Sequence, residues 1–105
     1  MNSWIALVLA GLCEIIWAVG LKYTVNFSKL LPSIMTIVAM VASLALLNVS
    51  LKTIPLSISY AVWTGIGVIG TVLFGVMYFG ETLNWIKAFS LMMIFLGIIG
   101  CKLSL

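Results

Sequence analysis

The chain has 105 residues, of which 65% are hydrophobic and 7% are charged, and its mean hydropathy is +1.37. So few polar groups cannot cover a soluble domain, and the composition therefore predicts an integral membrane protein. The net charge of +3 comes from five lysines and two glutamates without any basic run. The sequence therefore lacks the basic patch typical of a nucleic-acid-binding protein, and we exclude that class.

Four apolar segments follow one another along the chain, and each is close to the roughly 20 residues that a helix needs to cross a bilayer. They cover residues of about 3–21, 30–51, 56–79 and 85–103. Backbone polar groups in lipid must be satisfied within the segment, which favours helices over open strands. The sequence predicts one all-α domain, residues 1–105, with four transmembrane helices.

The boundaries of these segments carry the expected local signals. Pro32 and Pro55 stand at the starts of the second and third segments, where proline is tolerated. Gly80 and Asn84 bracket the last loop. The first segment lacks a basic leader and an A-x-A site and contains Glu14, so we expect a retained helix rather than a signal peptide.

The sequence predicts no metal site and no cofactor. Cys13 and Cys101 form neither a CxxC pair nor a secreted disulfide pattern and are expected to be small core residues. No Walker-type glycine motif is present, which excludes ATP-driven transport by this chain alone.

The lysines are nearly balanced between the two sides of the predicted bundle. One side has Lys52 and Lys102, and the other has Lys22, Lys29 and Lys87. Two against three is a weak bias under the positive-inside rule. We therefore expect both orientations to insert and an antiparallel dimer to form. Four helices alone also make a thin bundle that can hardly wall off a substrate.

Glu14 is the only charge between Ser3 and Leu21, and an intramembrane carboxylate is by default a functional residue. Gly11, one turn earlier, should leave space beside the carboxyl group, and Trp17 should overhang it. Other helices offer polar or aromatic groups on one stripe, which include Ser43, Tyr60, Trp63, Thr64 and Gly67. The alternatives are a structural, protonated Glu14 bonded to Tyr60 or Ser43, and ordinary aromatic packing in the third helix.

A buried carboxyl group facing aromatic rings suits exchange of a proton for a cation. Such a group can hold a proton near neutral pH or release it to accept a cation, so both compete for one site. That competition is enough for antiport if the site faces one side at a time. Aromatic rings stabilise the cation, and two carboxylates in a dimer could hold a planar guanidinium group.

Small residues allow close helix approach in the third and fourth segments. They are Gly65, Gly67, Gly70, Gly97 and Gly100. These glycines could serve a dimer interface or pack helices within one chain, and the pattern does not separate the two.

Over nearly its whole length the sequence resembles the small multidrug resistance family of dimeric four-helix exporters. The matching stretches are AGLCEIIWAVGLKYT at 10–24, LPSIMTIVAM at 31–40, AVWTGIGVIGT at 61–71, FGETL at 79–83 and LGIIGCKLS at 96–104. Glu14 together with the A-x-W-[ST]-G-x-G stretch is the specific signature. Trp17, Ser43, Thr64 and Lys102 resemble the guanidinium-exporter branch more than the multidrug branch.

The resemblance implies a role for each matching residue. Glu14 of each subunit would be the shared proton and substrate site, and Ser43 would hydrogen-bond its carboxylate. The residues that would line the pocket are Trp17, Tyr60, Trp63, Gly11 and Thr64. Gly65 and Gly67 would let the third helix kink, and Gly97 would hold an antiparallel homodimer. The implied setting is the inner membrane of a bacterium.

One stretch departs from the family pattern, because Ser57 and Ser59 stand where glycine and alanine are common. They could narrow the region between helices or bond back to the backbone, and they leave a heteromeric transporter open. The leading expectation is proton-coupled export of guanidinium and small substituted guanidines. The alternatives are export of quaternary or aromatic cations and a non-transporting membrane subunit.

Overall fold

The computed structural model describes residues 2–104, and every regular element in this part of the chain is an α-helix. The helices are α1 (Ser3–Tyr23), α2 (Leu30–Ser50), α3 (Leu56–Tyr78) and α4 (Trp85–Leu103). Each is long and apolar enough to cross a membrane. The prediction of an all-α protein with four transmembrane helices is confirmed.

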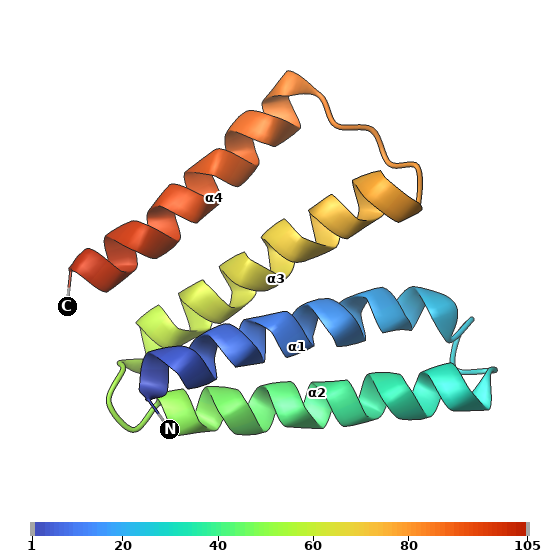
Figure 1. Cartoon of the computed structure of the whole chain (residues 1–105), viewed down its shortest axis with the longest axis horizontal. Coiled ribbons are helices and arrows are strands. Elements are labelled where there is room, and N and C mark those ends of the chain that lie inside the picture. The colour runs from blue at the N-terminus through green and yellow to red at the C-terminus, as the bar shows by residue number, and fades with distance from the viewer. Residues whose placement is uncertain (1, 105) are drawn as a thin grey trace.

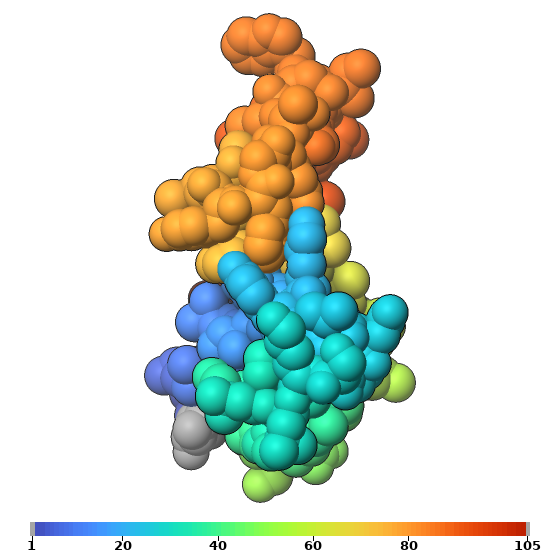
Figure 2. Space-filling view, turned by 90° about the vertical axis from the view of Figure 1, so that its right-hand side faces the viewer, coloured from blue at the N-terminus to red at the C-terminus, as the bar shows by residue number. Residues whose placement is uncertain are grey.

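Helix α1 packs against α2 and α3, α3 also contacts α2, and within residues 2–104 α4 packs against α3 alone. The molecule measures 42 × 35 × 17 Å, and the side view shows its narrow profile (Figure 2). In Figure 1, α1 lies between α2 and α3, while α4 lies beyond α3. Helix α4 therefore lies at one edge of the molecule, while α1 lies between its neighbours.

The core lies where α1, α2 and α3 meet. Its buried cluster contains Leu7, Ala10, Leu47, Ile54, Val62 and Trp63. Helix α4 has no buried residue among those described, and large apolar side chains are exposed along all four helices. Exposure of this kind is stable when the surroundings are lipid, because lipid is itself apolar.

The helix ends follow from local chemistry. The Asn84 side chain accepts a hydrogen bond of 2.7 Å from the Lys87 amide and caps the start of α4. Gly80 has a φ of +68° after α3. There the Glu81 amide donates to the Gly75 carbonyl at 3.1 Å, so the chain turns back over the last turn of α3.

Helix α1 ends two residues later than predicted, at Tyr23 rather than at position 21. The prediction stopped at the charge of Lys22, but a helix can continue beyond its apolar segment, and a cation near its carboxyl end is favourable. The turn that follows places Val25, Asn26 and Phe27 at positive φ values of 50°, 58° and 63°. The sequence has no glycine at these three positions that would have indicated a left-handed turn.

Candidate functional site

Glu14 lies near the middle of α1, and its carboxyl group packs directly over the backbone of Gly67 in α3. A Cβ atom at Gly67 would lie 2.9 Å from Glu14 Oε1 and closer still to the rest of the carboxyl group. Only glycine leaves room for this approach, so α3 provides the cradle in which the carboxyl group lies.

The carboxyl group is half-buried, and part of its hydrogen-bonding capacity is unused. Glu14 Oε2 is buried and has no hydrogen-bond partner among residues 2–104. An unsatisfied carboxyl oxygen in an apolar setting is costly. A proton, a cation or a group from a second subunit would relieve that cost.

Gly11 does not provide the space predicted for it. A side chain at Gly11 would meet Ile66 of α3, whose Cδ1 atom lies 3.2 Å from the position of an added Cβ. Gly11 therefore lets α1 and α3 approach each other, while Gly67 makes room for the Glu14 carboxyl group. Spacing along one helix could not show this, because the answer depends on which face of α3 opposes α1.

The expected hydrogen bond between Ser43 and Glu14 is not present in the described chain, and this prediction is corrected. Ser43 Oγ donates to the Ala10 carbonyl oxygen at 2.7 Å and accepts from Trp63 Nε1 at 2.8 Å. A hydroxyl group has one proton to donate, and the Ala10 carbonyl uses it. Ser43 thus joins α1, α2 and α3 one turn away from Glu14.

Replacing Ser43 with alanine should destabilise the protein by about 1 kcal/mol, since interhelical hydrogen bonds in membranes contribute about that much. The buried Trp63 indole would lose its acceptor. Unfolding in mixed micelles measures the effect. Ser90→Ala is the matched control, because the Ser90 hydroxyl is exposed and only bonds back to Ile86. Equal stability of the two variants would contradict a structural role for Ser43.

The aromatic residues expected near Glu14 divide into buried and exposed ones. Trp63 is 8% exposed, whereas Tyr60 is 56% exposed, and their rings meet edge to face with centroids 5.5 Å apart. Tyr60, Thr64 and Gly67 follow one another at helical spacing on α3. The half-buried Trp17 follows Glu14 by one turn, and its buried Nε1 has no partner within residues 2–104.

The remaining glycines separate into two groups. A Cβ at Gly65 would meet Ile98 of α4 at 2.9 Å, so Gly65 packs α3 against α4. Helix α3 continues through Gly65 and Gly67 without a break, and a kink at these residues stays a prediction. An added Cβ at Gly97 or Gly100 would meet nothing within 4 Å in the described chain, which leaves that side of α4 open to another helix.

The two serines that depart from the family pattern have different surroundings. Ser57 is exposed, whereas Ser59 is fully buried and its hydroxyl lies 3.3 Å from that of Ser50 in a hydrogen bond. Ser59 therefore joins α3 to α2. Residues 2–104 contain no group of three potential metal ligands.

These features define a small multi-pass membrane protein with one carboxyl group held between helices. Residues 2–94 match the family described as Small Multidrug Resistance protein. One relative, which comes from a strain of Escherichia coli, is named guanidinium exporter. It is 55% identical to this chain over 102 residues, which cover 97% of each chain. Guanidinium exporters from Proteus vulgaris and Citrobacter freundii are 54% and 50% identical over the same length, with 97–98% of each relative covered. The chain belongs to the small multidrug resistance family.

Proposed function

We propose that this protein is a proton-coupled antiporter that exports guanidinium and small substituted guanidinium ions across a bacterial inner membrane. The observation that carries the proposal is the Glu14 carboxyl group near the middle of α1, whose buried Oε2 has no hydrogen-bond partner within residues 2–104. Near-full-length relatives named guanidinium exporters support the choice of substrate.

The proposed mechanism is competition for Glu14. With a proton bound, the carboxyl group is neutral and stable in an apolar setting. When the proton leaves, the carboxylate can pair with a guanidinium ion, whose planar N–H groups match the two carboxylate oxygens. The nearby indole and phenol rings add cation–π attraction. Because one site cannot hold both, export of the cation is coupled to proton entry.

The functional unit would be a dimer. One chain measures only 17 Å along its shortest axis, Tyr60 is largely exposed, and no described residue of α4 is buried. A second copy would cover these surfaces and bring a second Glu14 to the site. The lysine balance favours antiparallel copies, with Gly97 packing at the interface; pairing with a different chain is the alternative.

A reporter fused to the C-terminus tests the orientation. In an antiparallel homodimer, the reporter should be found on both sides of the membrane in similar amounts. A reporter confined to one side would contradict dual topology, although it would leave the Glu14 mechanism intact.

Proton flux in liposomes tests the function. Purified protein in vesicles with a pH-sensitive dye should move protons against an imposed guanidinium gradient. Tetraphenylphosphonium should drive at least about tenfold less flux, since it cannot form the paired hydrogen bonds with a carboxylate, and about 1.4 kcal/mol gives that factor. Preference for tetraphenylphosphonium would favour the multidrug alternative, and no flux with any cation would favour a non-transporting subunit.

A further inference from the structure

Ser59 near the start of α3 is fully buried, and its hydroxyl group is held by α2. It lies 3.3 Å from the hydroxyl of Ser50, which is also fully buried. The Ser50 hydroxyl reaches the Leu47 carbonyl of its own helix at 2.6 Å. Because one hydroxyl group has one proton to donate, Ser50 gives its proton to the Leu47 carbonyl and accepts one from Ser59. The two serines therefore form a short relay that ties α3 to the backbone of α2.

A second tie between the same two helices lies one turn further along α3. Trp63 Nε1 donates to Ser43 Oγ at 2.8 Å, and Ser43 Oγ donates to the Ala10 carbonyl of α1 at 2.7 Å. Ser59 and Trp63 are about 6 Å apart along the helix axis at about 1.5 Å per residue. A helix attached at one point can pivot about it, whereas attachment at two points fixes its tilt. The two ties together fix this part of α3 relative to α2 and, through Ser43, relative to α1.

The aromatic side chains proposed to contact the cation belong to this part of α3. Tyr60 directly follows Ser59, and its ring meets the Trp63 ring edge to face with centroids 5.5 Å apart. Tyr60 is largely exposed, whereas Ser59 and Trp63 are buried. A change in tilt about the Trp63 tie would therefore move the Tyr60 ring relative to Glu14 on α1.

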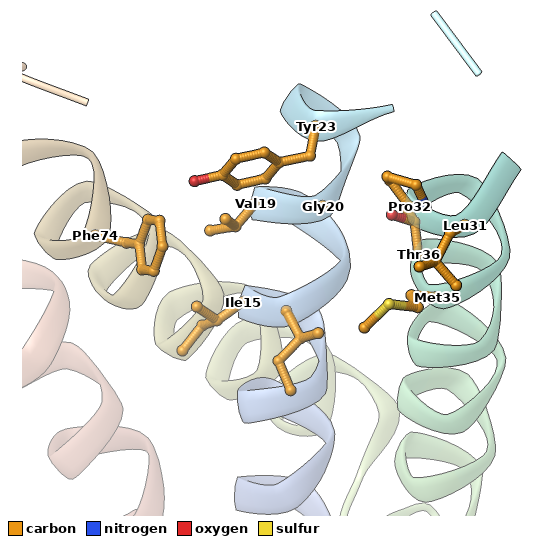
Figure 3. A pocket seen from close by; sticks show the side chains of 10 residues that line it. Ile15, Val19, Gly20, Tyr23, Leu31, Pro32, Met35, Thr36 and Phe74 are labelled. Carbon is orange, nitrogen blue, oxygen red and sulfur yellow. The ribbon is translucent and has the colours of Figure 1, made fainter. Parts of the chain in front are cut away.

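The groove shown in Figure 3 is a different surface. It has a volume of about 530 Å³ and lies beside the second half of α1. Among the described residues, α3 lines it with Phe74, near the carboxyl end of that helix, whereas Ser59 lies near the amino end. Ser59 therefore acts on the Tyr60–Trp63 pair and not on the groove.

We propose that Ser59 is a positioning residue that holds the Tyr60–Trp63 pair in place and thereby favours small cations over large ones. This rests on the proposed function, since it assumes that the pair contacts the transported cation. A fixed aromatic wall keeps a small, planar cation close to both the rings and Glu14, while a wall that can tilt also admits a bulky cation. Ser59 departs from the family pattern, so its tie to α2 does not follow from membership of the family.

Binding of two cations to the purified protein tests the proposal. Ser59→Ala removes the donor of the relay and leaves Ser50 bonded to its own helix. Guanidinium should bind about threefold more weakly, as expected for loss of one interhelical hydrogen bond in a membrane, and tetraphenylphosphonium at least as tightly as before. The ratio of the two dissociation constants should therefore change by about threefold or more. A partly unfolded protein would lose sites for both cations and leave the ratio unchanged.

Fluorine NMR reads the position of Trp63 without any substrate. The chain has four tryptophans, and after labelling with 5-fluorotryptophan the signal of Trp63 is the one that Trp63→Phe removes. In Ser59→Ala this signal should shift or broaden. The signal of Trp85, which is 90% exposed at the start of α4, should stay unchanged.

Two further variants provide the controls. Ser57→Ala makes the same change at an exposed position two residues away and should alter neither the ratio nor the Trp63 signal. Ser50→Ala removes the acceptor and should therefore resemble Ser59→Ala. The double variant should be no worse than the stronger single one, because both changes remove the same hydrogen bond.

An unchanged ratio of dissociation constants in Ser59→Ala would overturn the proposal. An equal change in Ser57→Ala, or additive effects of Ser50→Ala and Ser59→Ala, would overturn it too. Failure of the proposed function looks different, since the unaltered protein would then bind no guanidinium. In that case the fluorine spectra decide whether Ser59 positions Trp63: an unchanged Trp63 signal in Ser59→Ala rejects this role, and a shifted signal supports it.

Discussion

Replacing Glu14 with glutamine should abolish guanidinium-driven proton flux in liposomes. The amide keeps the shape of the side chain but neither releases a proton nor carries the charge that holds the cation. Losing one partner of a buried ion pair costs about 3–5 kcal/mol. Guanidinium binding should therefore weaken by at least about two orders of magnitude, and flux should fall to the level of empty vesicles.

Glu81→Gln is the matched control for this experiment, because it makes the same chemical change at an exposed carboxyl group. It should keep most of the flux. Glu14→Asp should fall between the two, since it keeps the charge but withdraws it from Gly67 by one methylene. Full proton flux in Glu14→Gln would contradict the mechanism. Loss of flux in both Glu14→Gln and Glu81→Gln would indicate a general defect in assembly.

The helices were predictable because the bilayer imposes a simple rule on the sequence. Apolar runs of membrane-spanning length must form helices, and Gly80 and Asn84 mark the last loop by their own local chemistry. The left-handed turn at Val25 was not predictable, since a β-branched residue is disfavoured there. Backbone hydrogen bonds within the turn, from Ser28 to Val25 and from Lys29 to Thr24, accompany this conformation.

The chemistry of the site was predictable only in part. Placing an acidic side chain in an apolar membrane helix costs free energy, and such residues are usually functional. Glu14 could therefore be singled out without a structure. Its neighbours could be singled out only in part: Gly67 belongs to the stripe named from the sequence and contacts Glu14, but helical spacing does not show which face of one helix meets another. Ser43 illustrates the difference, since Ala10 and Trp63 take the hydrogen bonds that were expected to reach Glu14.

Gly67→Ala should impair transport while leaving the protein folded. The added methyl group would occupy the space of the Glu14 carboxyl group, and that flexible side chain can turn away at little cost. Alanine also favours a helix over glycine by up to about 1 kcal/mol, so stability should stay the same or rise. Misplacing a functional group by about 1 Å can cost about 100-fold in activity, and guanidinium-driven flux should fall by about tenfold or more.

Gly70→Ala distinguishes displacement of the carboxyl group from simple crowding of the helices. Gly70 is one turn further along α3, and its added methyl group would meet Ile15 of α1, the apolar neighbour of Glu14. Crowding alone would lower stability and flux in both variants to a similar extent. If Gly67 acts as the cradle of Glu14, then Gly67→Ala loses guanidinium affinity at unchanged stability, whereas Gly70→Ala loses stability first. Wild-type affinity in Gly67→Ala would show that the carboxyl group works equally well away from α3.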